Sequence, residues 1–98
     1  MLKVAGNIVT SIEVYNEEDY ENIKSFKVNQ DDNIQTLLET VYNYIIELKK
    51  SDRKFGYWDK FHYYIELETA DDSFGPYKIV KLRNSNVYKI HRYTIPPR

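Results

Sequence analysis

Acid–base chemistry in this chain would depend on two histidines, His62 and His91, which are its only imidazoles. Together with Glu66, Arg83 and Arg92, they could cleave RNA without a metal by general acid–base catalysis. Each of these five residues is more simply explained as a solvent-facing residue of a strand. The chain has no cysteine and none of the motifs HExxH, GxSxG or the glycine-rich phosphate loop. We therefore expect a non-enzymatic protein and keep a small metal-independent ribonuclease as the third of three hypotheses.

Metal and cofactor chemistry has little support in the sequence. The adjacent carboxylates Asp31 and Asp32, and Asp71 and Asp72, lack the spaced oxygen ligands of a calcium loop. Without cysteine, neither a thiolate zinc site nor a disulfide can form. We expect no metal and no cofactor.

The C-terminal part of the chain is basic and aromatic, because from Tyr77 onward it carries six Lys or Arg residues and no Asp or Glu. Cations that contact phosphates, beside rings on which bases stack, are typical of a surface that binds single-stranded nucleic acid or a nucleotide. Alternation predicts a hairpin of strands 77–83 and 87–95. One face of this hairpin carries the first candidate partner-binding residues: Tyr77, Lys81, Arg83, Lys89, His91 and Tyr93.

This choice of face depends on the hairpin register. A three-residue loop with Asn86 in the left-handed conformation pairs Leu82 with Tyr88, and it segregates apolar from basic residues. It also places Lys81 opposite Lys89, which destabilises a hairpin unless an anion lies nearby. That anion is either an external partner or the carboxylates of Glu66 and Glu68 on the preceding strand, and the sequence leaves both open.

Two further clusters could contact a partner. Six aromatic residues lie within residues 55–64, and aromatic side chains are favoured in binding hot spots, although a loop between a helix and a sheet also uses them to seal the core. The candidates among them are Tyr57, Trp58 and Tyr64.

The second cluster is an acidic patch that is either a solvated loop or a surface that binds a basic groove of a partner: Glu17, Glu18, Asp19 and Glu21.

These residues must be positioned by regular elements. Residues 2–14 alternate as a half-buried strand with even-numbered residues inward, and their length predicts a bend, bulge or break at Gly6 and Asn7. Asn16 followed by acids predicts a helix cap and one short turn, before a second strand at residues 26–28.

The clearest element is an amphipathic helix at residues 33–50. Asp32 is expected to cap it, and the Gln35 side chain is expected to bond back to the Asp32 backbone N–H, as in a capping box. Residues 61–68 then alternate as a strand with Tyr63, among others, turned inward.

We predict a single α+β domain, residues 1–98, with a mainly antiparallel twisted sheet of about five strands in ββαβββ order and one helix on one face. The N-terminal segment lacks the continuous apolar run of a signal peptide, and no run approaches the roughly 20 apolar residues that span a bilayer. We therefore expect a cytoplasmic protein with no membrane partner, either a monomer or a homodimer.

The leading functional hypothesis is a small binding protein that docks on a host protein or nucleoprotein and inhibits or modulates it, as an anti-defence protein of a phage or mobile element would. It depends on the missing catalytic motifs, the aromatic clusters and a division of charge, which is −6 over residues 1–48 and +5 over residues 49–98. A nucleic-acid-binding module that uses the basic hairpin is the second hypothesis.

Overall fold

The chain folds as one helix and a six-stranded antiparallel sheet, in a computed structural model that describes residues 1–54, 56 and 62–96. The elements in chain order are β1 (Lys3–Val4), β2 (Asn7–Asn16), β3 (Asn22–Lys27), α1 (Ile34–Lys54), β4 (Tyr63–Thr69), β5 (Ser73–Lys81) and β6 (Tyr88–Arg92). The predicted α+β class, with a mainly antiparallel sheet and a single helix, is confirmed. The sheet has one strand more than expected because residues 2–14 contribute two.

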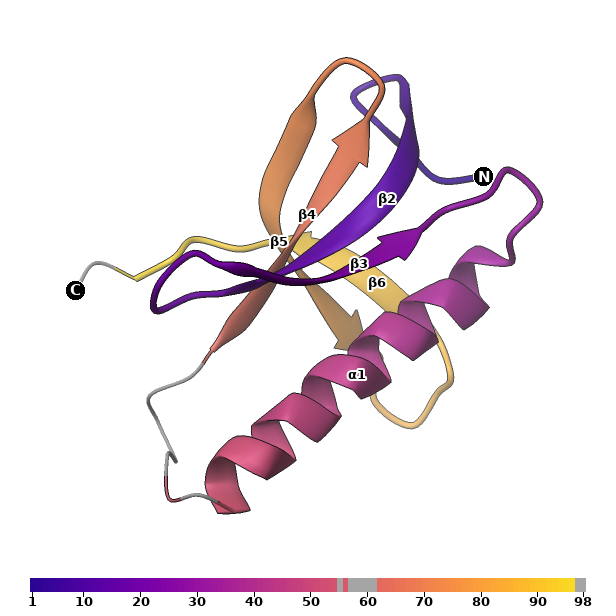
Figure 1. The fold of residues 1–98 in the computed structure, drawn as a ribbon. Coiled ribbons are helices and arrows are strands. Elements are labelled where there is room, and N and C mark those ends of the chain that lie inside the picture. The colour runs from indigo at the N-terminus through magenta and orange to yellow at the C-terminus, as the bar shows by residue number, and fades with distance from the viewer. Residues whose placement is uncertain (55, 57–61, 97–98) are drawn as a thin grey trace.

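The sheet is built around β2, which pairs with β4 along one edge and with both β3 and β1 along the other. The order then continues through β5 to β6. Between β3 and β4 the chain passes through α1, which lies along one side of the sheet (Figure 1). The buried core joins this helix to four of the strands, and its apolar members include Val9, Ile12, Val14, Leu38, Val41, Ile65, Leu67, Ile79 and Tyr88.

The strand expected at residues 2–14 is interrupted close to Gly6 and Asn7, where a bend, bulge or break was predicted. Ala5 and Gly6 have φ angles of 49° and 81°, and they form the two-residue turn of a hairpin in which Val4 opposes Asn7. A second irregularity lies between Val9 and Ser11, where the register of β2 against β4 shifts. This bulge reverses the alternation, so Val9 is buried while Ile8 is 40% exposed. The expected inward direction of even-numbered residues is therefore wrong at Ile8, whereas Leu2 and Val4 do pack against the core.

The helix begins at Ile34 and ends at Lys54, four residues beyond the expected end. Its cap is Asn33, whose side-chain oxygen accepts the backbone N–H of Thr36 at 3.2 Å. The predicted cap by Asp32 is wrong, because that carboxylate accepts the backbone N–H of Asn29 at 2.8 Å instead. The capping-box role of Gln35 is wrong too, since its side chain reaches β6.

The segment between β2 and β3 is a hairpin turn, and the expected short helical turn is absent from it. The Asn16 side chain does accept a backbone N–H, that of Glu18, at 2.8 Å. The backbone N–H of Asn16 donates to the carbonyl of Glu21 at 2.9 Å and closes the turn. No helix of the described ranges is long and apolar enough to cross a bilayer.

Candidate functional site

The β5–β6 hairpin has a different register from the predicted one. Ile79 opposes Ile90 and Lys81 opposes Tyr88, and Leu82 donates its N–H to the carbonyl of Val87 at 2.9 Å. The loop therefore has four residues, 83–86. Within it Asn84, with φ of 59°, takes the left-handed conformation that was expected at Asn86. The predicted pairings, including Lys81 opposite Lys89, are wrong by one residue.

This shift separates the residues that were predicted to share a face. Directly opposite residues of an antiparallel pair lie on the same face. Tyr77 and Lys81 therefore lie on the side of Ile79 and Tyr88, which contact the core. The other side, which we name the hairpin outer face, carries Lys78, Val80, Leu82, Val87, Lys89 and His91.

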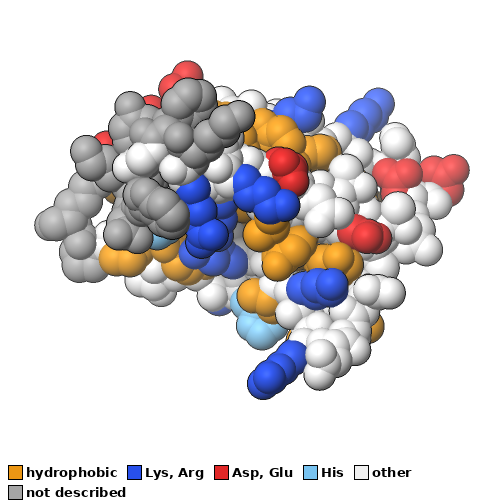
Figure 2. Space-filling view, turned by 90° about the horizontal axis from the view of Figure 1, so that it is seen from below, with side chains coloured by type: hydrophobic (Ala, Val, Ile, Leu, Met, Phe, Trp, Pro, Cys, Tyr) orange, Lys and Arg blue, Asp and Glu red, His pale blue; other side chains and the backbone are white. Residues whose placement is uncertain are grey.

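The hairpin outer face combines exposed apolar and cationic side chains. Leu82 is 38% exposed and Val87 is 41% exposed. Lys89, His91 and the loop residue Arg83 are exposed beside them. Figure 2 shows Lys and Arg side chains beside hydrophobic ones on the face seen from below, with some Asp and Glu side chains among them.

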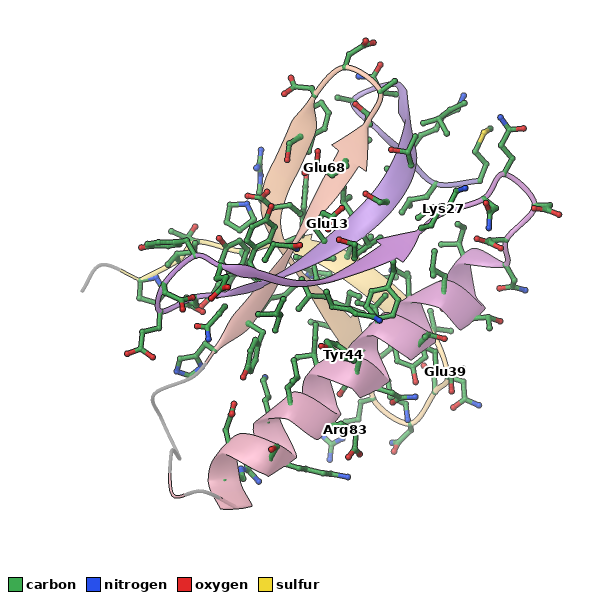
Figure 3. The ribbon with its side chains drawn as sticks, viewed as in Figure 1. Glu13, Lys27, Glu39, Tyr44, Glu68 and Arg83 are labelled. Carbon is green, nitrogen blue, oxygen red and sulfur yellow. The ribbon has the colours of Figure 1, made fainter. Side chains whose placement is uncertain are left out.

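No acidic side chain of the described residues forms an ion pair with the hairpin cations. The ion pair between two described residues, Lys50 and Glu47 at 3.4 Å, lies on α1 and not on the hairpin. Glu66 and Glu68 instead accept hydrogen bonds from the Ser73 hydroxyl, at 3.3 and 2.8 Å. Glu68 also lies at the opposite end of the molecule from Arg83 (Figure 3). Internal neutralisation by Glu66 and Glu68, which the sequence left open, is therefore not supported by any ion pair between described residues.

The two tyrosine rings proposed as stacking platforms are covered on one side by cations of the chain itself. The Arg92 guanidinium lies 5.5 Å from the centre of the Tyr77 ring, and the Lys78 ammonium lies 4.0 Å from that of Tyr93. A base would have to displace these cations in order to stack on that side of the rings.

Tyr93 is also held by Glu17, a residue expected in the acidic patch. Both Glu17 carboxylate oxygens lie within hydrogen-bond distance of the Tyr93 hydroxyl, at 2.8 and 2.9 Å. Burial together with this bond raises the pKa of Tyr93 to about 12. Glu17 is only 9% exposed, so the exposed acidic patch consists of Glu18, Asp19 and Glu21 alone.

The aromatic candidates differ in where they lie. Tyr64 is 5% exposed, and its ring stacks on that of Tyr15 with 5.4 Å between centres. Burial and the nearby charge of Glu66 raise the pKa of Tyr64 to about 12. Tyr64 is therefore buried in the sheet and is not available as a surface contact. Tyr57 and Trp58 lie outside the described residues.

A small cavity of about 40 Å³ lies between α1 and strands β4 and β5. Tyr63 is among its lining residues, and its hydroxyl donates to Asp52 at 2.7 Å. Lys49 and Lys78 also line it, and burial, with the like charge of Lys49, lowers the pKa of Lys78. A cavity of this size has room for only a few water molecules.

Catalytic geometry is sparse in the described residues. His62 and His91 are exposed, and no side-chain hydrogen bond orients either imidazole in the described part of the chain. No group of three His, Cys, Asp or Glu side chains within the described ranges could hold a metal ion.

The fold and its surface define an α+β protein with a single helix whose main candidate site is an exposed hairpin face. Comparison with protein-family models, curated proteins and solved structures found no match.

Proposed function

We propose that this protein binds another protein through the hairpin outer face and modulates its activity without catalysing a reaction. The observation that carries the proposal is the exposure of Leu82 and Val87 beside Lys89 and Arg83, with no ion pair from any other described residue to those cations. Partly exposed apolar side chains gain free energy when a partner covers them, and cations without an internal partner favour an acidic partner surface.

A host-directed role is part of the same proposal. A chain of 98 residues without a recognisable catalytic motif suits an inhibitor that acts by covering a surface. The partner is then an acidic surface of a host protein or nucleoprotein, and the source is a phage or mobile element. Lys, Ile, Asn and Tyr are abundant and Ala occurs only twice, a usage typical of A+T-rich coding sequences, which supports this origin.

Nucleic-acid binding is the alternative that the hairpin cations allow. Its support is weaker because the register divides the predicted residues between two faces and cations cover one side of both rings. Apolar side chains in the middle of the hairpin outer face also contribute little to phosphate binding. Nuclease treatment of a captured complex distinguishes the two ideas, because only contacts that depend on nucleic acid are lost.

The test is affinity capture from a low-GC bacterial lysate with wild type, Lys89→Glu and Lys27→Glu. Lys27 is the matched control because it is also an exposed strand lysine, but on β3 (Figure 3). We expect wild type and Lys27→Glu to retain one nuclease-resistant, stoichiometric protein, and Lys89→Glu to lose most of it. Equal capture by the two variants, or no stoichiometric protein with wild type, would refute the proposal.

A further inference from the structure

The outer edge of β6 is open, because β6 pairs only with β5 in the described chain. Leu82 donates to the carbonyl of Val87 and Tyr93 donates to the carbonyl of Pro76, so Val87 and Tyr93 turn their backbone groups toward β5. Inward and outward groups alternate along an antiparallel strand. Tyr88, Ile90 and Arg92 therefore direct their N–H and C=O groups away from the sheet.

One end of this edge is already occupied by a substitute for a neighbouring strand. The Gln35 side chain accepts the N–H of Tyr88 at 2.7 Å and donates to its carbonyl at 3.0 Å. A carboxamide thus reproduces the two bonds that a backbone unit would make. Ile90 and Arg92 have no such partner in the described chain, so four backbone groups remain available in a row.

We infer that a partner binds by adding an extended, acidic segment as a further strand along β6, an inference that rests on the proposed function. Strand addition gains affinity from main-chain bonds and specificity from alternate side chains. Side chains of the added strand beside Lys89 and His91 fall on the hairpin outer face and are acidic. The side chain beside Ile90 falls on the core side and is apolar.

The charges on both sheet edges argue against a second copy of this chain as the occupant. Pairing of two β6 strands brings Lys89 and Arg92 of each copy toward the same cations of the other. The other open edge, β3, presents Lys24 and Lys27, which are also exposed. Like charges on neighbouring strands are destabilising, whereas an acidic segment is complementary to β6.

The far end of the edge leaves room for such a segment. Beyond Arg92 the surface opens into a shallow hollow lined by Pro76, Tyr93, Thr94 and Ile95 as well. The segment therefore meets Gln35 at one end and a hollow at the other. This limits its main-chain pairing to a short stretch around Ile90 and Arg92.

The first test measures backbone amide exchange by NMR with a defined probe, the peptide acetyl-Val-Glu-Val-Glu-Val-Glu-Val-amide. At saturation we expect the exchange of the Ile90 and Arg92 amides to slow about tenfold or more, as for amides that gain a hydrogen bond. The control peptide has the same composition with its glutamates in one block. Failure of the alternating peptide to bind, or equal protection by the block peptide, would overturn the inference.

The second test uses two substitutions at one exposed residue, Arg92→Pro and Arg92→Ala. Both remove the guanidinium, but only proline removes the outward N–H, and an edge position of this kind tolerates proline because no ladder bond is lost. We expect Arg92→Pro to weaken peptide binding about tenfold relative to Arg92→Ala, the size of one hydrogen bond. Equal affinities of the two folded variants would refute strand addition.

These tests separate strand addition from the proposed function. The Lys89 amide points toward β5, so Lys89→Glu changes the docking face and leaves the open edge intact. If Lys89→Glu abolishes partner capture while Ile90 and Arg92 stay unprotected, docking uses side chains alone and strand addition is wrong. Protection at Ile90 that rises with protein concentration in the absence of peptide would identify a second copy as the occupant and overturn the inference.

Discussion

The bond pair between Gln35 and Tyr88 should contribute measurably to the stability of the fold. Each net hydrogen bond contributes about 0.5–1.5 kcal/mol, so Gln35→Ala should lower the free energy of unfolding by roughly 1–3 kcal/mol. Tyr88 is 4% exposed, which limits how well water can replace the lost partner. For a domain of this size the loss corresponds to a fall in Tm of roughly 4–24 °C.

The control for this substitution is Glu39→Ala. Glu39 is an exposed residue of the same helix, and glutamate and glutamine have similar helix propensities, so both variants gain the same few tenths of a kcal/mol from alanine. Gln35→Glu is a second variant, because a carboxylate accepts the Tyr88 N–H but cannot donate to its carbonyl. We expect it to lose much of the same stability above neutral pH.

The measurement is urea unfolding of wild type and the three variants, combined with amide exchange at Tyr88. If the Gln35 side chain replaces a neighbouring strand at Tyr88, Gln35→Ala lowers the unfolding free energy and speeds amide exchange at Tyr88. Glu39→Ala should change the unfolding free energy by no more than a few tenths of a kcal/mol and leave exchange at Tyr88 unchanged. Equal stability of Gln35→Ala and Glu39→Ala would refute this account of the β6 edge.

Three further predictions follow from the described contacts. Tyr93→Phe removes the donor to the Glu17 carboxylate and should cost about 1.5–3 kcal/mol in urea unfolding, and a loss below 0.5 kcal/mol, about the least a net hydrogen bond contributes, would contradict this role. Gly75→Ala would place its Cβ 3.1 Å from the carbonyl oxygen of Ile65 and should destabilise by about 1–3 kcal/mol, so an unchanged Tm would show that the strands adjust. The folded-state pKa values of Tyr64 and Tyr93, both raised to about 12 mainly by burial, lie above the usual value of about 10, so the stability they contribute is present below pH 10 and falls as pH rises toward 12. Titration of both phenols near pH 10, followed by ultraviolet absorbance, would contradict the last prediction.

The helix and β4 could be predicted because their burial follows a regular period. Leu38 and Val41 lie on the inward stripe of α1, and Ile65 and Leu67 alternate along β4 as expected. A period reports which side of an element is buried, whatever lies on that side. The α+β class followed from these periods and from the turn residues between them.

The bulge near Ser11 and the burial of Glu17 were not predictable in the same way. A bulge inserts one residue on one strand and depends on the partner strand, so the sequence of β2 alone carries no sign of it. Glu17 sits in an acidic run, and its burial depends on a hydroxyl 76 residues away in the chain. Such a contact exists only after the sheet has formed.

The hairpin register shows how one residue decides the character of a site. Loops of three and four residues both fit the sequence between Leu82 and Val87, and both offer an asparagine for the left-handed position. The four-residue loop gains bonds from Ser85, whose hydroxyl donates to the Leu82 carbonyl and accepts the N–H of Val87, each at 3.2 Å. Side-chain polarity favoured the other loop, because segregation of apolar from basic residues is the usual arrangement in a half-buried hairpin.

The same alternation makes the two binding elements of β6 genetically separable. On an edge strand, every second residue directs its backbone N–H and C=O outward, and the side chains of these residues all lie on one face of the sheet. The residues between them direct their backbone groups inward, and their side chains lie on the other face. On β6 the open amides belong to Ile90 and Arg92, whereas the side chains of the hairpin outer face belong to Lys89 and His91. A charge substitution at Lys89 therefore leaves the edge bonds in place, and proline at Arg92 leaves the outer face in place. Loss of binding in only one of these two variants shows that the partner uses only the corresponding element, the outer face or the open edge. Loss of binding in both shows that the partner adds a strand that uses the face and the edge together.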